Sequence, residues 1–209
     1  MPSDKKSLFN YSETSDEVKF KTLDDVKEVC LTCIKCDLSK SRTQVVFSAG
    51  DPQAKLMLIG EAPGRQEDET GIAFVGRAGQ LLDKILLSQN ITREKDVYIC
   101  NTVKCRPPEN RVPTDAEMEA CSVYLDSQIQ LIRPKLILLS GATAVRRMLG
   151  IKSGISKIRG QWFDGPLGSK MMPIFHPSYL LRHESKEPGT PKWLMWQDIQ
   201  EVRKALDAL

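Results

Sequence analysis

Four short apolar runs recur along the chain, and helical patterns separate them. The runs span residues 56–59, 97–100, 136–139 and 171–175. Apolar residues recur at helical spacing in segments 78–88, 114–132 and 142–149, and in a last segment from about residue 192 to residue 209. This alternation predicts an α/β fold, a three-layer α/β/α sandwich around a central sheet of four parallel strands.

The remaining segments suggest a simple domain organisation. Residues 1–20 are polar and charged and lack the apolar centre of a signal peptide, so we expect a flexible N-terminal arm. A short helix is predicted from Leu23, and residues 21–209 are expected to form a single domain. Thr114 and Glu117 have the capping-box spacing that marks a helix start. No apolar run approaches the roughly 20 residues of a membrane helix, and we expect a cytoplasmic, intracellular monomer.

Three of the four predicted strands end in loops rich in polar residues. The loops begin at Gly60, Asn101 and His176. Because the carboxyl ends of parallel strands share one edge of a sheet, we expect these loops to converge on one pocket, where α/β proteins bind ligands. Turn glycines and acids at helix starts explain the same composition without a site. The net charge of +3 does not prove a nucleic-acid partner, but it leaves room for a local basic face.

Six cysteines stand out in a chain that is expected to be intracellular, where disulfides are disfavoured. Cys30, Cys33 and Cys36 form two overlapping C-x2-C pairs, and Cys105 and Cys121 follow 16 positions apart. A C-x2-C pair with two distant cysteines suits a four-thiolate site, for which zinc and a [4Fe–4S] cluster are both chemically possible. The spacing does not decide between them. Cys100 lies in a predicted strand and is expected to be a buried apolar residue.

Several separated motifs, in order, carry a resemblance to a known family. They are Gly60–Gly64, Phe74–Leu82, Asn101–Pro108, Asn110–Arg111 and His176–Arg182. From about Cys33 to Leu209 the chain resembles the family-four uracil-DNA glycosylases, the iron–sulfur branch of the uracil-DNA glycosylase superfamily. The resemblance implies hydrolysis of the N-glycosidic bond of deoxyuridine in DNA, which leaves an abasic site for base excision repair. It also implies a [4Fe–4S] cluster and selects its ligands as Cys33, Cys36, Cys105 and Cys121.

The resemblance also suggests roles in base recognition. Phe74 offers a ring face to the base, and the Asn101 carboxamide matches uracil O4 and N3–H. His176 is placed to donate to uracil O2 as negative charge develops there. Ala62 and Gly64 are expected to lie against the substrate.

The residue that positions the attacking water is left open. In a sister family an aspartate takes this part, but Ala62 stands at that position here. Glu61, Glu67 and Asn110 resemble the catalytic positions of the family. We favour Glu67 or Asn110 for orienting water, and Glu61 for ordering the loop or stabilising positive charge on the sugar.

DNA contacts are expected around the same loops. The basic candidates are Arg77, Lys104, Arg106, Arg111 and Arg182, each of which would neutralise a phosphate unless it is an ordinary surface charge. Leu180, between Tyr179 and Leu181, is expected to fill the space that the flipped base leaves. The alternative is that one or two of these apolar residues pack on the sheet.

Three other functions compete with the glycosylase interpretation. One is a catalytically quiet module that binds uracil-containing or damaged DNA. Another is a related branch that links covalently to the abasic sugar, but residues 107–111 lack the histidine expected there. The last is a structural zinc protein with a nucleotide pocket.

Overall fold

The computed structural model describes residues 20–152 and 154–209, so the arm expected at residues 1–20 lies almost wholly outside the described part. The helices are α1 (Leu23–Leu31), α2 (Arg65–Thr70), α3 (Arg77–Leu87), α4 (Arg93–Asp96), α5 (Asp115–Ile132), α6 (Ala142–Leu149), α7 (Pro177–Leu180) and α8 (Pro191–Asp207). The strands are β1 (Ala49–Gly50), β2 (Leu56–Gly60), β3 (Val97–Asn101), β4 (Leu136–Ser140), β5 (Phe163–Asp164) and β6 (Lys170–Ile174).

The four apolar runs form the parallel centre of one sheet. The strand order is β1-β3-β2-β4-β6-β5, and the four inner strands pair in parallel. Leu58 lies between Ile99 and Leu138, which fixes the register across three strands. Two-residue antiparallel strands close each edge. The predicted four-stranded parallel sheet is confirmed, with two short edge strands added.

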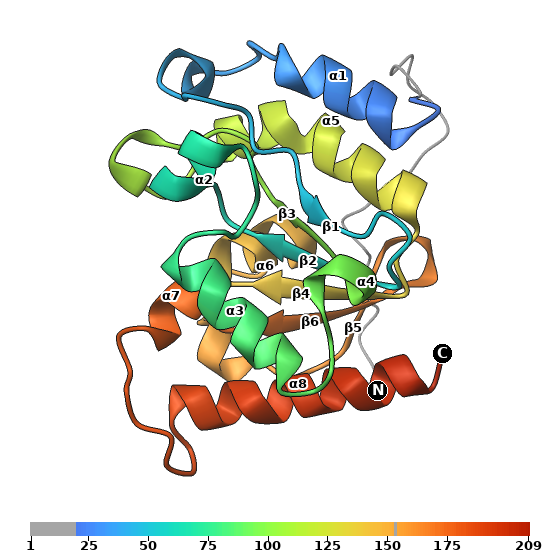
Figure 1. Cartoon of the computed structure of the whole chain (residues 1–209), viewed down its shortest axis with the longest axis vertical. Helices are drawn as coiled ribbons and strands as arrows, with labels where there is room; N and C mark the ends of the chain where they lie inside the picture. Colours follow the sequence, from blue (N-terminus) through green and yellow to red (C-terminus); the bar gives the residue numbers. More distant parts are fainter. Residues whose placement is uncertain (1–19, 153) are drawn as a thin grey trace.

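Alternate side chains of each strand point to opposite faces of the sheet, and a layer of helices covers each face, as predicted (Figure 1). Leu58 and Ile99 face the cluster that contains α3 and α8, whereas Met57 and Ile137 face α5 and α6. Strands covered on both faces are apolar throughout rather than alternating with polar residues, which is the pattern seen in the sequence. The three-layer α/β/α sandwich is therefore confirmed.

A third apolar cluster lies outside these layers, where α1 packs on α5. Val26 of α1 and Met118 of α5 contribute to it, together with several cysteines. The capping box predicted at Thr114 is present: Thr114 Oγ1 accepts from Glu117 N at 3.2 Å, and Thr114 N donates to Glu117 Oε2 at 2.8 Å. This cap fixes where α5 begins and hence where its Cys121 lies.

The carboxyl ends of β2, β3 and β6 lead into the three polar loops. Figure 1 shows α2, α7 and the start of α3 at the edge of the sheet toward which β2 and β4 point. Helices α2, α4 and α7 were not predicted, because four to six residues are too few to show helical periodicity. Within the two described ranges, no helix is long and apolar enough to cross a membrane.

Candidate active site and cysteine cavity

The three loops meet around a cavity of about 240 Å³. Its lining comes from all of them: Glu61, Ala62, Pro63, Gly64, Glu67, Phe74, Ala78, Asn101, Pro107, Asn110, Arg111, His176 and Ser178. Every residue expected to take part in catalysis or base binding is among these. We call this space the base cavity.

Main-chain hydrogen bonds fasten the first loop to the second. Thr102 N donates to Gly60 O at 3.0 Å, and Val103 N donates to Glu61 O at 3.3 Å. A Cβ on Gly60 would lie 2.4 Å from Asn101 Oδ1 and 2.5 Å from Phe74 Cζ, closer than real contacts allow. Glycine is therefore required at position 60 so that Phe74 and Asn101 can lie side by side.

Phe74 forms one wall of the base cavity from a strained backbone. It is 5% exposed, and its φ of 54° lies in the left-handed region, which is uncommon for a bulky side chain and costs roughly 1–3 kcal/mol. Arg93 stabilises this turn by donating to Ala73 O at 2.7 Å and to Phe74 O at 2.6 Å. The Phe74 and His176 ring centroids lie 5.7 Å apart, with the planes tilted by 38°.

Asn101 ends β3 on the floor of the base cavity. The residue is 1% exposed, and its Oδ1 has no hydrogen-bond partner among the described residues. An unpaired buried acceptor costs roughly 1–3 kcal/mol, so it calls for an explanation. A ligand N–H would supply the missing donor.

His176 has a defined tautomer. The Ser178 main-chain N–H donates to His176 Nδ1 at 3.2 Å, so Nδ1 is an acceptor and the ring proton lies on Nε2. The Ser178 hydroxyl lies 2.7 Å from the same nitrogen. Burial lowers the pKa of His176 to about 4, although the negative charge of Glu67 acts to raise it. The imidazole is therefore neutral at pH 7 and keeps one donor.

The two glutamates of the first loop have different partners. Glu67 accepts main-chain N–H groups from Gly64 at 3.1 Å, Val75 at 3.0 Å and Gly76 at 2.8 Å. It therefore orders the loop, the part expected of Glu61. Glu61 Oε2 instead accepts the hydroxyl of Thr143, at the start of α6. Glu61 also lines a second cavity of about 350 Å³ next to the first.

Asn110 and Arg111 form the outer rim of the base cavity, and Arg106 bonds to Asn110. Asn110 is exposed with φ 53°, and its Oδ1 accepts from Arg106 Nε at 2.7 Å. Arg111 makes a bidentate ion pair with Glu117, at 2.8 and 2.6 Å. The guanidinium lowers the pKa of Glu117 to about 2. This pair fastens the second loop to the start of α5.

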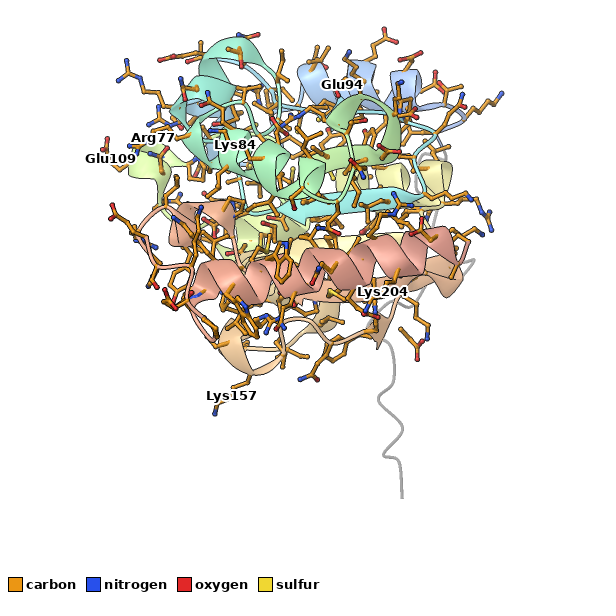
Figure 2. The ribbon with its side chains drawn as sticks, turned by 60° about the horizontal axis from the view of Figure 1, so that its bottom comes forward. Arg77, Lys84, Glu94, Glu109, Lys157 and Lys204 are labelled. Carbon is orange, nitrogen blue, oxygen red and sulfur yellow. The ribbon has the colours of Figure 1, made fainter. Side chains whose placement is uncertain are left out.

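Two expected DNA contacts are wrong, because the side chains are buried. Leu180 is fully buried in the core with α3 and α8, while its neighbour Leu181 is 37% exposed. Lys104 is 1% exposed, and its ammonium donates to Asn101 O and Gln128 Oε1 inside the protein. Arg77 and Arg182 are exposed as expected, and Figure 2 shows Arg77 pointing outward at the start of α3.

Five cysteines surround a second site, beneath the second loop. Cys30, Cys33, Cys36, Cys105 and Cys121 line one small cavity, together with Arg42, Lys104 and Tyr124. Arg42 Nη1 donates to Cys105 Sγ at 3.2 Å and to Cys33 O at 2.7 Å. Cys100 is buried in β3 among core residues, as expected. The structure therefore also brings in Cys30, for which the sequence suggested no role.

The chemistry of this cavity suits a thiolate-bound metal group. Burial raises the pKa of Cys121 to about 12, Lys104 acts to lower it, and the neighbouring thiols Cys105 and Cys33 raise it again. Several thiolates crowded together need a cation to compensate their charge. Sulfur ligands select soft metals, including zinc and iron–sulfur clusters. Within the described ranges, no three His, Cys, Asp or Glu side chains are already grouped as they would be around a metal ion.

Several contributors were not found from the sequence. Thr143 and Arg93 bond to residues that line the base cavity from elements far away in the chain, and Ser178 lines the cavity itself and bonds to His176. Only Ser178 carried a signal, because it lies two residues after the histidine in the third loop.

This combination of fold and cavity belongs to a known class. The family model of the uracil DNA glycosylase superfamily matches residues 47–200, and the chain belongs to that superfamily. Within it, the similarity is to proteins named type-4 uracil-DNA glycosylase. The one from Thermotoga maritima is 48% identical over 179 residues, which cover 85% of this chain and 91% of the relative. Those from Archaeoglobus fulgidus and Sulfurisphaera tokodaii are 40% and 37% identical, covering 77% and 88% of this chain and 83% and 84% of the relatives.

Proposed function

We propose that this chain is a type-4 uracil-DNA glycosylase. It hydrolyses the N-glycosidic bond of deoxyuridine in DNA, releases uracil and leaves an abasic site for base excision repair. The proposal rests above all on one observation: the base cavity combines an unpaired amide oxygen on Asn101 with a neutral His176. The type-4 names of relatives that cover most of both chains support it.

The substrate nucleotide must leave the DNA stack before its glycosidic bond can be reached. The base then lies against Phe74, whose ring supplies a flat apolar wall. The strain at Phe74 and the glycine at position 60 both support a ring held in place before the base arrives. Ala62 and Gly64 line the same cavity with little bulk, leaving room for the ring.

Asn101 selects uracil. Its Oδ1 accepts from uracil N3–H, and its amide nitrogen donates to O4. Cytosine presents the reverse pattern, so the same fixed amide would face a donor with a donor and an acceptor with an acceptor. Each mismatched buried group costs about 1–3 kcal/mol, or roughly 10- to 100-fold in rate.

His176 stabilises the departing base. Its Nε2–H donates to uracil O2, where negative charge develops as the C1′–N1 bond breaks. Such a prepositioned donor contributes roughly 3–4 kcal/mol of transition-state stabilisation. A neutral imidazole keeps its proton in this role, and the low pKa from burial supports that form.

The remaining roles, orienting the attacking water and stabilising the sugar, fall to the loop glutamates and to Asn110. We propose that Asn110, on the rim, orients the water, and that Glu61 faces the positive charge that grows on the sugar. The hydroxyl of Thr143 fixes the Glu61 carboxylate for this task. Glu67 holds the loop and is the alternative group for orienting the water.

The cysteine cavity fits a [4Fe–4S] cluster bound by Cys33, Cys36, Cys105 and Cys121. When bound, the cluster supplies a rigid cross-link, since hydrolysis needs no electrons. Those cysteines join the segment after α1 to the second loop and to α5. That loop leads to Asn110 and Arg111, so cluster loss is expected to disturb the rim of the base cavity.

We propose that uracil-containing DNA is the partner of this protein. The active protein is proposed to be an intracellular monomer, with one domain from residue 21 onward. Exposed Arg77 and Arg182, with Arg106, are proposed to contact phosphates, which predicts affinity that falls with salt.

A time course on a labelled oligonucleotide with one uracil, cleaved with alkali after incubation, tests the proposal. Uracil-specific breaks with many turnovers, and none at thymine or cytosine, are expected. Cluster-loaded protein that binds the uracil strand without breaking it would instead indicate a quiet binding module.

A further inference from the structure

Lys104 is a buried lysine between the two cavities. It is 1% exposed and lines the cysteine cavity. Its Nζ donates to the main-chain oxygen of Asn101 at 2.8 Å and to Gln128 Oε1 at 2.6 Å. Both acceptors are neutral, yet burying a lysine head is costly unless its contacts compensate. A cation kept in such a place calls for a role beyond filling space.

Gln128 extends this contact into a buried network. From α5 its Nε2 donates to Tyr98 OH at 2.9 Å and to Phe47 O at 3.1 Å. Gln128 is fully buried, so its amide orientation is fixed by these partners. Gln128 Oε1 is therefore a second acceptor for Lys104 Nζ, beside the main-chain oxygen of Asn101 that Lys104 holds directly.

The held carbonyl belongs to the residue that reads the base. Asn101 is the last residue of β3, and its main chain turns there into the second loop. Its Oδ1 has no hydrogen-bond partner among the described residues, so no such bond fixes this end of the amide in the free protein. The Lys104 bond to the main-chain oxygen of Asn101, together with the pairing of Asn101 with Gly60 in the sheet, therefore restrains where that amide lies.

We propose that Lys104 is a positioning residue for uracil recognition, holding the Asn101 backbone so that its amide meets the base edge. The inference rests on the proposed function. It gives the buried ammonium a purpose that DNA contact cannot supply, because Lys104 does not reach the surface. It also joins base recognition to the wall of the cysteine cavity through a single side chain.

Two binding constants distinguish a positioning role of Lys104 from a general structural role. Free uracil inhibits through the base cavity and depends on Asn101, whereas DNA carrying a tetrahydrofuran abasic analogue has no base to read. For Lys104→Met we expect the inhibition constant of free uracil to rise about tenfold or more, because a loosened amide loses about one hydrogen bond. The dissociation constant for the abasic-analogue DNA should stay unchanged. Iron content and melting temperature are recorded on the same samples.

Two matched variants serve as controls. Gln128→Met breaks the same buried network but leaves Lys104 bonded to Asn101, so uracil inhibition should stay close to that of the wild type. Lys157→Met removes a lysine that points into solvent (Figure 2) and does not line the base cavity, so it should change neither constant. Where Lys104→Met does not fold, Lys104→Arg is used, since a longer planar guanidinium cannot replace an ammonium held on two close acceptors.

The outcomes are distinct. Weaker uracil inhibition with unchanged abasic-analogue binding in the Lys104 variant alone supports the inference. Equal loss in the Lys104 and Gln128 variants, loss of both constants together, or unchanged uracil inhibition overturns it. Uracil excision by the wild-type protein is scored separately, so absence of excision refutes the proposed function and not merely the role of Lys104.

Discussion

Arg93 holds Phe74 by its main chain: Nη2 donates to Phe74 O at 2.6 Å, while Nη1 donates to Ala73 O. The guanidinium is anchored in turn by Asp83 and is largely buried, at 14% exposure. Phe74 sits at φ 54°, so this clamp offsets a strained backbone. Gly79 allows α3 to approach the main chain of Phe74, because a Cβ at position 79 would lie 1.8 Å from Phe74 O.

Arg93→Met should loosen the Phe74 wall. We expect the free energy of unfolding to fall by about 2 kcal/mol, since charged hydrogen bonds to buried carbonyls are lost. Because the ring then lacks a fixed position, kcat/KM for uracil should fall about tenfold. Denaturant unfolding and initial rates measure the two effects. Asp83→Asn keeps both carbonyl contacts and should cost less activity; if Arg93→Met is destabilised but fully active, the clamp does not position the ring.

His176 should titrate far below an ordinary histidine. Burial lowers its pKa to about 4, from an unfolded value near 6.5. The unfolded chain therefore binds more protons between these values, and stability contributed at His176 is complete above pH 6.5 and lost as pH falls through about 4. NMR of the imidazole resonances measures this directly, and His176→Ala assigns the signal because the chain has two histidines. A pKa of 6.5 or higher at His176 contradicts the neutral donor.

Asn101→Ala should separate activity from stability. The change removes both hydrogen bonds to uracil, so kcat/KM should fall by about 100-fold or more. The unpaired Oδ1 disappears as well, so thermal stability should be unchanged or slightly higher. Calorimetry and excision rates test the pair of outcomes. A large drop in melting temperature would show that Asn101 is a structural residue.

Cysteines that line the cysteine cavity and the cysteine in the sheet should respond differently to substitution. Cys105→Ser is expected to lose iron, colour and part of the folded population, because Cys105 lines the cysteine cavity. Cys100→Ser should keep iron and colour, since Cys100 is buried in the sheet among apolar residues, though it costs about 1–3 kcal/mol for an added buried hydroxyl. Iron analysis and visible absorbance distinguish them. A well-folded, iron-free and fully active Cys105→Ser protein would contradict the structural role of the cluster. Zinc in place of iron in the wild-type protein would refute the cluster itself.

Two adjacent leucines should behave in opposite ways. Leu180→Ala is expected to destabilise by about 2–5 kcal/mol, because Leu180 is fully buried in the core. Leu181→Ala should leave stability unchanged but slow excision from double-stranded DNA, if the exposed Leu181 fills the space of the flipped base. Comparison of single- and double-stranded substrates isolates that effect. If Leu181→Ala changes the rate relative to wild type by the same factor on single- and double-stranded substrates, the wedge is excluded.

The sequence predicted the features that repeat or that end a strand. Apolar runs located all four parallel strands, and the polar residues after them located the base cavity. It could not predict β1 and β5, since two residues carry no period. It also misplaced Leu180 and Lys104, because the direction of a side chain in a four-residue helix or a loop depends on packing from distant elements. Residue type alone made Lys104 a surface cation, whereas acceptors on β3 and α5 bury it.

Roles inside the cavity were harder still to predict. Glu61 and Glu67 are alike as sequence letters, and only the donors around each carboxylate distinguish them. Main-chain N–H groups of the first loop surround Glu67, while a hydroxyl from α6 meets Glu61. Such partners come from backbone geometry, which one sequence does not reveal.

Release of free uracil is the most direct measure of the central claim. Excess DNA with one uracil per strand is incubated with cluster-loaded protein, and liberated base is quantified by mass spectrometry beside His176→Ala. The account predicts many uracil molecules per protein molecule, no cytosine or thymine, and a rate about 100-fold lower for the variant. Tight binding of the uracil strand without released base would contradict it.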